Sequence, residues 1–322
     1  MSVLVYTESD NGNFKKNALE VASYASEVAK QLGTTATAIS INSNENETLG
    51  AYGISKVLNV SSDQLNTFNA KAYAYAIIEA AKSEDAKVII VSSSSDTKFL
   101  APIVSAKLSA GYAANVVTAP DSTSPFTVKR TVFSNKGYAH TQINTAIKIV
   151  GVSYNSFGLV ENNTSVSVED FNPVLEDADF NTKSVEIDKV VGKVTIADAD
   201  IVVSGGRGLK GPENWGMIEG LAEVLGAATA CSKPVSDMGW RPHSEHVGQT
   251  GKPVASNLYI AIGISGAIQH LAGVSASKTK VVINTDPEAP FFKAADYGIV
   301  GDAFEVVPKL IEKLKEFKAQ NA

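Results

Sequence analysis

Short apolar runs of strand length alternate along this chain with segments whose apolar residues recur at helical spacing. Residues 2–7 form such a run, and residues 15–32 then carry a helical pattern that Gly33 ends. The alternation continues through residues 35–41, 68–82 and 87–91. Strands that are apolar throughout need cover on both faces, which crossover helices supply in parallel sheets. The sequence therefore predicts an α/β fold of mostly parallel sheets flanked by helices.

The length of 322 residues is enough for two domains, each with its own core. Residues 161–189 are polar and acidic and have little helical period, so the boundary is predicted near residue 188. The first domain would end in strands at 126–133 and 147–152 and an edge strand at 164–168. In the second domain, strands are predicted at 199–203, 227–231, 258–262 and 281–284, with helices at 213–225 and 306–317.

Composition and charge exclude several classes of function. A net charge of -6 argues against nucleic acid as a partner, because that needs clustered Lys and Arg. The single cysteine, Cys231, rules out an internal disulfide and, lying in an apolar run, favours a buried structural thiol. His243 and His246 have no supporting carboxylates, so no metal site is predicted. With no signal peptide and no apolar stretch of spanning length visible, we expect a cytoplasmic protein that is not membrane-embedded.

A predicted strand at residues 258–262 runs into a glycine-containing turn and then a helix start. Gly263 and Gly266 allow close approach to the backbone, and unpaired N–H groups at a helix start favour an anion. A phosphate or pyrophosphate is the expected occupant. His270 follows this turn; a lone histidine is more often structural, but its place beside an anion site favours a role in binding.

Residues 206–211 fit the G-x-G-x-x-G dinucleotide pattern, which would indicate an NAD-dependent oxidoreductase. Pro212 interrupts the helix start, however, and the next strand ends in Cys231-Ser232-Lys233 rather than in an acidic residue. Arg207 fits better as a cation facing a phosphate or an electron-rich ring, or it is a solvated loop residue.

Three further polar segments have both a functional and a structural interpretation. Ser232 and Lys233 follow a strand, where they could hold an anion or merely cap a helix. Gln249 and Thr250 could read the polar edge of a heterocycle or form a simple turn. Residues 92–96 resemble a phosphate loop without its lysine. No nucleophile–base–acid set stands out, so no catalytic residue is predicted and a carrier is favoured over an enzyme.

Five segments together resemble the alpha subunit of electron transfer flavoproteins. They are SGGRG at 204–208, VGQTGK at 247–252, LYIAIGISGAIQHLAG at 258–273, INTDPEAPFF at 283–292 and ADYGIVGD at 295–302. The resemblance implies an N-terminal α/β domain, residues 1–188, of the nucleotide-hydrolase type that contacts a beta subunit. It also implies a Rossmann-like domain, residues 189–322, that binds one FAD.

The resemblance also implies a function and a set of cofactor contacts. The heterodimer would take electrons from flavin dehydrogenases, typically acyl-CoA dehydrogenases of fatty acid beta-oxidation, and pass them to a membrane quinone oxidoreductase. Arg207 would lie over the flavin, Gln249 and Thr250 near its N5 and O4 side, and His270 near O2. The full set implied by the resemblance is Arg207, Ser232, Lys233, Val247, Gly248, Gln249, Thr250, Ser265, Gly266, Ala267, Ile268, Gln269, His270, Asn284, Asp302 and Ala303.

Two points stay open at this stage. The family often has Arg after the serine of the strand-end motif, whereas this chain has Lys233, a cation without the planar fork of Arg. A flavin-bifurcating member of the same family, in which the beta subunit also carries FAD, is the alternative to a simple carrier. In either case Arg207, Lys233 and His270 are expected to favour the negative charge that develops on the reduced flavin.

Overall fold

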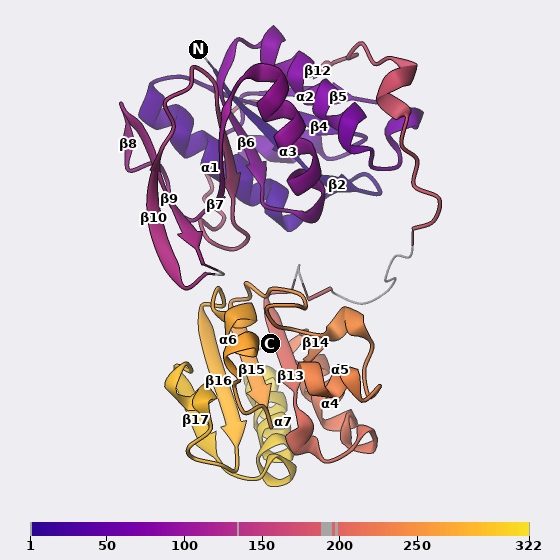
Figure 1. Ribbon diagram of the computed structural model, residues 1–322, viewed down its shortest axis with the longest axis vertical. Helices are drawn as coiled ribbons and strands as arrows, with labels where there is room; N and C mark the ends of the chain where they lie inside the picture. Colours follow the sequence, from indigo (N-terminus) through magenta and orange to yellow (C-terminus); the bar gives the residue numbers. More distant parts are fainter. Residues whose placement is uncertain (1, 134, 188–194, 197–198, 322) are drawn as a thin grey trace. The chain divides into compact units, whose positions relative to one another are not determined.

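The computed structural model describes residues 2–133, 135–187, 195–196 and 199–321. The chain divides into two compact units, the first with residues 1–132 and 137–188, the second with residues 133–136 and 189–322. Each unit is a sheet with helices packed against it (Figure 1), which confirms the predicted α/β class. The boundary predicted at residue 188 lies outside the described residues.

The first unit is built on a ten-stranded sheet with the order β10-β9-β7-β11-β6-β1-β4-β5-β12, with β8 paired to β9. Its strands are β1 (Ser2–Thr7), β4 (Ala36–Ile41), β5 (Lys56–Val60), β6 (Ala86–Ser92), β7 (Gly111–Val116), β8 (Ser122–Thr123), β9 (Phe126–Val132), β10 (Gly137–Gln142), β11 (Lys148–Val152) and β12 (Ser167–Asp170). A separate hairpin joins β2 (Ser9–Asp10) and β3 (Asn13–Phe14). The helices are α1 (Lys16–Leu32), α2 (Ala70–Ser83) and α3 (Ser95–Leu108).

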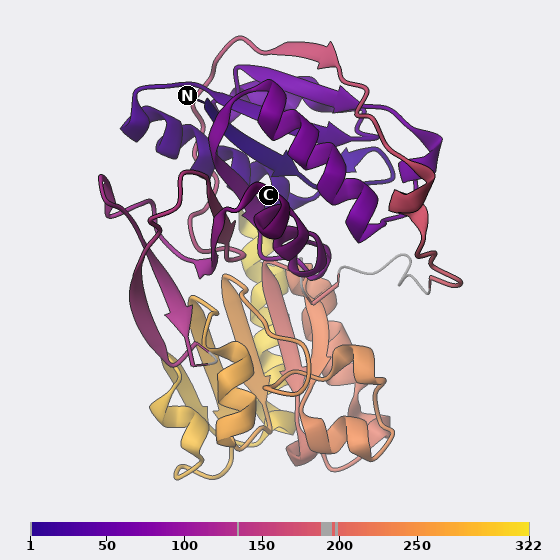
Figure 2. The ribbon, with the colours of Figure 1, turned by 45° about the horizontal axis from the view of Figure 1, so that its top comes forward.

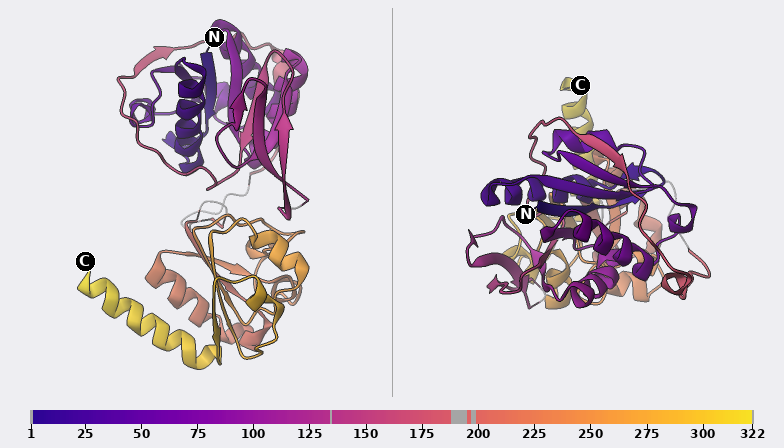
Figure 3. Two further views of the ribbon diagram at one scale, coloured as in Figure 1. Left: turned by 90° about the vertical axis from the view of Figure 1, so that its left-hand side faces the viewer. Right: turned by 90° about the horizontal axis from the view of Figure 1, so that it is seen from above.

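Helices cover both faces of this sheet, as the apolar strands require. α1 packs Val21 and Val28 against Val3 on one face, while α2 and α3 pack against Leu4 and Ile89 on the other (Figure 3). These side chains are buried, and alternate residues of β1 point to opposite faces, so a single strand contributes to both cores.

The strands β5, β7 and β10 of this sheet were not predicted. β10 reads GYAHTQ and alternates between half-buried and exposed side chains, so it lacks the apolar run that marked the other strands. It pairs antiparallel with β9, and β9 is antiparallel to β7, so this end of the sheet departs from the parallel pattern. The predicted edge strand at 164–168 lies at Ser167–Asp170, paired with β5 at the edge of the sheet.

The second unit holds a five-stranded sheet with the order β14-β13-β15-β16-β17, and each of these pairings is parallel. Its strands are β13 (Ile201–Gly205), β14 (Ala228–Cys231), β15 (Leu258–Ile262), β16 (Thr279–Asn284) and β17 (Tyr297–Val300). Its helices are α4 (Gly216–Leu225), α5 (Lys233–Asp237), α6 (Ile268–Val274) and α7 (Ala303–Gln320). α4 and α7 pack on one face of the sheet and α6 on the other (Figure 2). Over the described residues, every helix is too short or too polar to cross a membrane.

One buried carboxylate ties α1 to a distant loop of the first unit. The side chain of Glu20 accepts hydrogen bonds from the backbone N–H groups of Asn155 (2.8 Å), Phe157 (2.8 Å) and Gly158 (2.9 Å). Charge-assisted bonds of this kind are stronger than neutral ones. We expect Glu20→Gln to lower the free energy of unfolding by about 2 kcal/mol, since the amide offers one acceptor oxygen in place of two. Urea unfolding measures the change.

The matched control is Glu27→Gln on the same helix. Glu27 is half-buried and accepts one hydrogen bond from the side chain of Gln31, four residues further along. Its replacement should change the free energy of unfolding by less than about 0.5 kcal/mol. Equal losses in the two variants would contradict the role given to Glu20.

Candidate cofactor site

The carboxyl ends of all five strands of the second sheet lie at one edge, because every pairing is parallel. From β13 the chain passes to β14 on one side, while β15, β16 and β17 follow one another on the other side. The order therefore reverses between β13 and β15. In open α/β sheets, ligands bind at the carboxyl edge beside such a switch point.

Two glycine turns meet at this switch point. The N–H of Gly206 donates to the carbonyl of Ile262 (2.8 Å), and the N–H of Gly208 donates to the carbonyl of Gly263 (3.1 Å). A Cβ at Gly206 would lie 2.1 Å from the oxygen of Gly263, closer than any side chain can approach. The contact therefore requires glycine, and it leaves Arg207 exposed between the two turns.

The residues of the predicted dinucleotide fingerprint do not open a helix. Arg207–Leu209 and Pro212–Asn214 are two short 3-10 turns, and α4 begins only at Gly216. Lys210 has φ 70°, which ends the first turn before a helix can form. An NAD pyrophosphate needs a helix N-terminus directly after the glycines. The alternative of an NAD site at Gly206–Gly211 therefore has no structural basis.

Ser232 lies beside the end of β13, and Val247 beside the end of β14. The N–H of Ser232 donates to the carbonyl of Gly205 (3.1 Å), and the N–H of Val247 donates to the carbonyl of Cys231 (3.0 Å). Ser232 is buried and precedes α5, but its side chain makes no capping bond. Lys233 is the first residue of α5 and reaches Asp237 on the same helix, with Nζ 3.5 Å from Oδ1.

The segment from Val247 to Thr250 is held against α6. The N–H of Gln249 donates to the carbonyl of Gln269 (2.8 Å). A Cβ at Gly273 would lie 2.5 Å from the Cα of Gly248, so the backbones of turn and helix are in direct contact. Two groups of predicted cofactor residues, 247–250 and 265–270, are thereby brought side by side.

His270 is a buried imidazole with one bonded nitrogen. Its Nε2 lies 2.9 Å from the hydroxyl of Tyr259, whereas Nδ1 has no hydrogen-bonding partner among the described residues. Burial lowers the pKa of His270 to about 4, with a smaller contribution from the charge of His246, while the backbone of Val247 opposes the shift. At neutral pH this side chain is therefore uncharged.

Sequence reasoning missed Tyr259 as a residue of the site. It is fully buried on β15 and its ring stacks on Phe291, with centroids 6.3 Å apart and planes 1° apart. The backbone of Phe291 in turn donates to the carbonyl of Ser265 (3.1 Å). A polar atom at a buried position of an apolar strand is the signal that could have identified Tyr259, since a buried hydroxyl needs a partner.

The residues predicted for the adenosine end lie at the far strands of the same edge. Asn284 ends β16, and its amide donates to the carbonyl of Ile264 (3.1 Å). The N–H of Gly301 donates to the carbonyl of Asn284 (3.0 Å), which brings the next turn alongside. Asp302 caps α7 through Phe304 N–H (3.0 Å), and Ala303 is the first, buried residue of that helix.

Two further titratable groups near this edge are Cys231 and His243. Cys231 is fully buried, and burial raises its pKa to about 12, which confirms the predicted inert thiol. A ring nitrogen of His243 lies 3.1 Å from the hydroxyl of Ser236. Among the described residues, no three His, Cys, Asp or Glu side chains are grouped so as to hold a metal ion.

The buried imidazole makes stability depend on pH. Its folded-state pKa of about 4 lies below the usual 6.5, so the unfolded chain binds the proton more readily. The stabilising contribution is complete above pH 6.5 and is lost as the pH falls towards 4, by about 3 kcal/mol in all. We expect the difference in unfolding free energy between wild type and His270→Asn to shrink over that window, measured by urea unfolding. A difference that stays constant from pH 7 to 4.5 would contradict the assignment.

Comparisons with known proteins agree on one family. A model described as the electron transfer flavoprotein domain matches residues 3–176, and one described as the electron transfer flavoprotein FAD-binding domain matches residues 195–275. The electron transfer flavoprotein subunit alpha of Thermoanaerobacterium thermosaccharolyticum is 37% identical and covers 98% of both chains. The subunit alpha of Bacillus subtilis is 37% identical, and the match covers 82% of each chain. The subunit alpha of Syntrophomonas wolfei is 31% identical, and the match covers 97% of this chain and 98% of the Syntrophomonas protein. The chain therefore belongs to the electron transfer flavoprotein alpha-subunit family, and its cofactor is FAD.

Proposed function

We propose that this chain is the alpha subunit of a heterodimeric electron carrier that holds its FAD at the carboxyl edge of the second sheet. It would pair with an electron transfer flavoprotein beta subunit, accept electrons from flavin dehydrogenases, typically acyl-CoA dehydrogenases, and pass them to a membrane quinone oxidoreductase. The observation that carries the proposal is the meeting of the turns at Gly206–Gly208 and Gly263–Gly266 at the switch point.

The residues at this edge fit a dinucleotide with a flavin ring. Gly266 has φ 86°, and a Cβ there would lie 2.5 Å from the nitrogen of Phe291, so its turn has room only for backbone. The unpartnered Nδ1 of His270 is a buried polar atom that needs a partner. The turn at Ser265 to Gln269 would hold the pyrophosphate, and Asn284, Asp302 and Ala303 the adenosine end.

The bound flavin would supply the one-electron chemistry, while the protein sets its potential. Arg207 is exposed beside the switch point and can place its guanidinium against the ring. Gln249 and Thr250 would donate hydrogen bonds to the polar edge of the ring. Ser232 and Lys233 would add a hydroxyl and a cation. His270, uncharged here, would act as an N–H donor rather than through a net charge.

The function is tested on the chain purified with its beta subunit. We expect flavin absorbance, one FAD in this subunit, and rapid bleaching when a reduced acyl-CoA dehydrogenase is added. Two FAD per heterodimer would favour the bifurcating alternative. A colourless complex, or one that the dehydrogenase leaves oxidised, would contradict the proposal.

The potential of the flavin tests the role of His270. Because an N–H donor at the flavin favours its reduced, negatively charged form, His270→Ala should lower the potential for the first electron by about 60 mV, a tenfold change in the equilibrium constant. Spectroelectrochemical titration measures this. An unchanged potential in a variant that keeps its FAD would exclude His270 from the site.

Tyr259 should act on the same property through His270. Tyr259→Phe removes the hydroxyl that lies 2.9 Å from Nε2 and leaves the ring stack in place. We expect the potential to fall by less than in His270→Ala, and the free energy of unfolding to fall by about 1 kcal/mol. Tyr297→Phe, an exposed tyrosine of β17, is the control and should change neither. Loss of stability without any change in potential would restrict Tyr259 to a structural role.

A further inference from the structure

The first unit has a switch point of its own. From β1 the chain passes through α1 to β4 on one side, and from β6 through α3 towards β7 on the other, so the order reverses between β1 and β6. Residues 92–96, which resemble a phosphate loop without its lysine, run from the last residue of β6 into α3 at this edge. The edge therefore has the topology of a ligand site, although the second unit holds the cofactor of this family.

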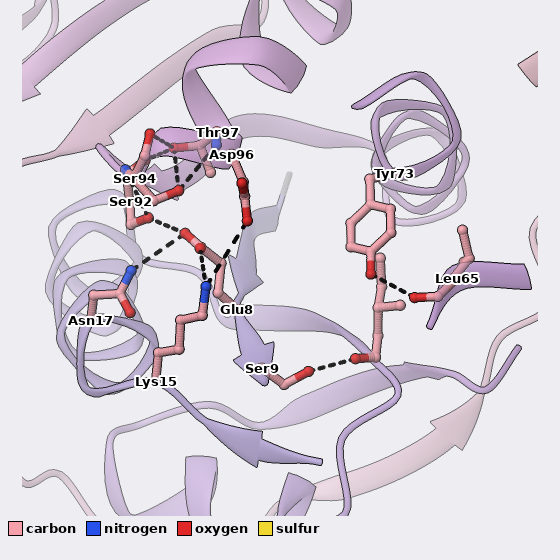
Figure 4. Close-up of polar contacts among 11 residues, drawn as sticks. Glu8, Ser9, Lys15, Asn17, Leu65, Tyr73, Ser92, Ser94, Asp96 and Thr97 are labelled. Atoms are coloured by element: carbon pink, nitrogen blue, oxygen red, sulfur yellow. Dashed lines mark hydrogen bonds and ion pairs between the residues drawn. The ribbon is translucent and has the colours of Figure 1, made fainter. Parts of the chain in front are cut away.

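A carboxylate of the chain itself lies at this place (Figure 4). Glu8 directly follows β1 and is 2% exposed. One of its oxygens accepts a hydrogen bond from the hydroxyl of Ser92 and lies 3.4 Å from Nδ2 of Asn17. The other lies 3.4 Å from Nζ of Lys15. Donors from the end of β6 and from the first turn of α1 thus converge on a single buried carboxylate.

The surroundings fix these donors in place. The hydroxyl of Ser92 accepts the N–H of Ser94 (3.3 Å), so its own proton is directed at Glu8. Ser94 caps α3 by accepting the N–H of Thr97 (3.0 Å). Asn17 turns its Nδ2 towards Glu8, which leaves its Oδ1 without a partner among the described residues.

The charged groups named at this edge carry a net negative charge, one ammonium against two carboxylates. Lys15 lies between Glu8 and Asp96, with Nζ 4.0 Å from the carboxylate of Asp96. Burial lowers the pKa of Lys15, but the two carboxylates raise it by more, so the ammonium stays charged. An external phosphate would place a further anion against the buried carboxylate of Glu8, which is costly in a site of low dielectric constant.

We infer that the carboxyl edge between β1 and β6 is an oxyanion site whose occupant is the side chain of Glu8. The site excludes external phosphates while Glu8 is present, and it accepts a small carboxylate, or a phosphate, once Glu8 is shortened. Residues 92–96 then line a site that the carboxylate of Glu8 already occupies.

Chemical rescue tests this inference in the full-length chain with its cofactor and partner. Glu8→Ala removes a fragment with the composition of acetate. We expect faster amide exchange in the peptide covering residues 92–97, since Ser92 and Lys15 lose their acceptor. Acetate at ten times its dissociation constant should slow that exchange about tenfold, whereas chloride at equal ionic strength should not.

Controls separate a filled site from a general loss of stability. Glu84→Ala removes a carboxylate that pairs with Lys56 (2.7 Å) elsewhere in the same unit. Acetate should not slow amide exchange in this variant. In wild type, neither acetate nor inorganic phosphate should slow exchange at residues 92–97. Phosphate protection in wild type, or no acetate effect in a folded Glu8→Ala chain, would overturn the inference. Should Glu8→Ala not fold, phosphate protection in wild type would still overturn the inference.

Discussion

Two backbone hydrogen bonds between the turns after β13 and β15 fix the carboxyl edge of the second sheet, where the candidate cofactor site lies. The N–H groups of Gly206 and Gly208 bind the carbonyls of Ile262 and Gly263, so the turns after β13 and β15 are locked together. Because no side chain fits between them, these turns present backbone and one exposed guanidinium, that of Arg207. The turn at residues 247–250 packs directly against α6 at the same edge of the sheet.

The fold was largely predictable because parallel strands are apolar throughout. Strands such as β6 and β15 stand out as unbroken apolar runs, and the helices between them carry a clear period. β10 was missed because its exposed residues carry no such run, and β17, YGIV, because it is only four residues long. β5 and β7 were missed because Asn59 and Asn115 interrupt their short apolar segments. Pro212 correctly indicated that no helix begins at the glycine pattern, although only the structure shows the two short turns that replace it.

Some features of the candidate site could likewise be predicted from the sequence, and others could not. Its backbone turns follow from glycines and strand ends, which can be read locally. The protonation of His270 could not be read in this way, because it depends on burial and on the neighbouring His246 and Val247, more than twenty residues away in sequence. Glu8 was missed for a similar reason: its partners Ser92 and Asn17 meet only when β1 and β6 pair. Electrostatic environments are properties of the packed chain, whereas turns are properties of short segments.

The burial of Cys231 has a practical consequence. It is the single thiol of the chain, fully covered at the end of β14, and nearly all of it is protonated at neutral pH. Peroxide formed when a reduced flavin meets oxygen would find no reactive thiolate on the native protein. For the same reason, an alkylating reagent can label this chain only after β14 separates from the sheet. Labelling rates would therefore report the opening of the second unit alone, without an introduced probe.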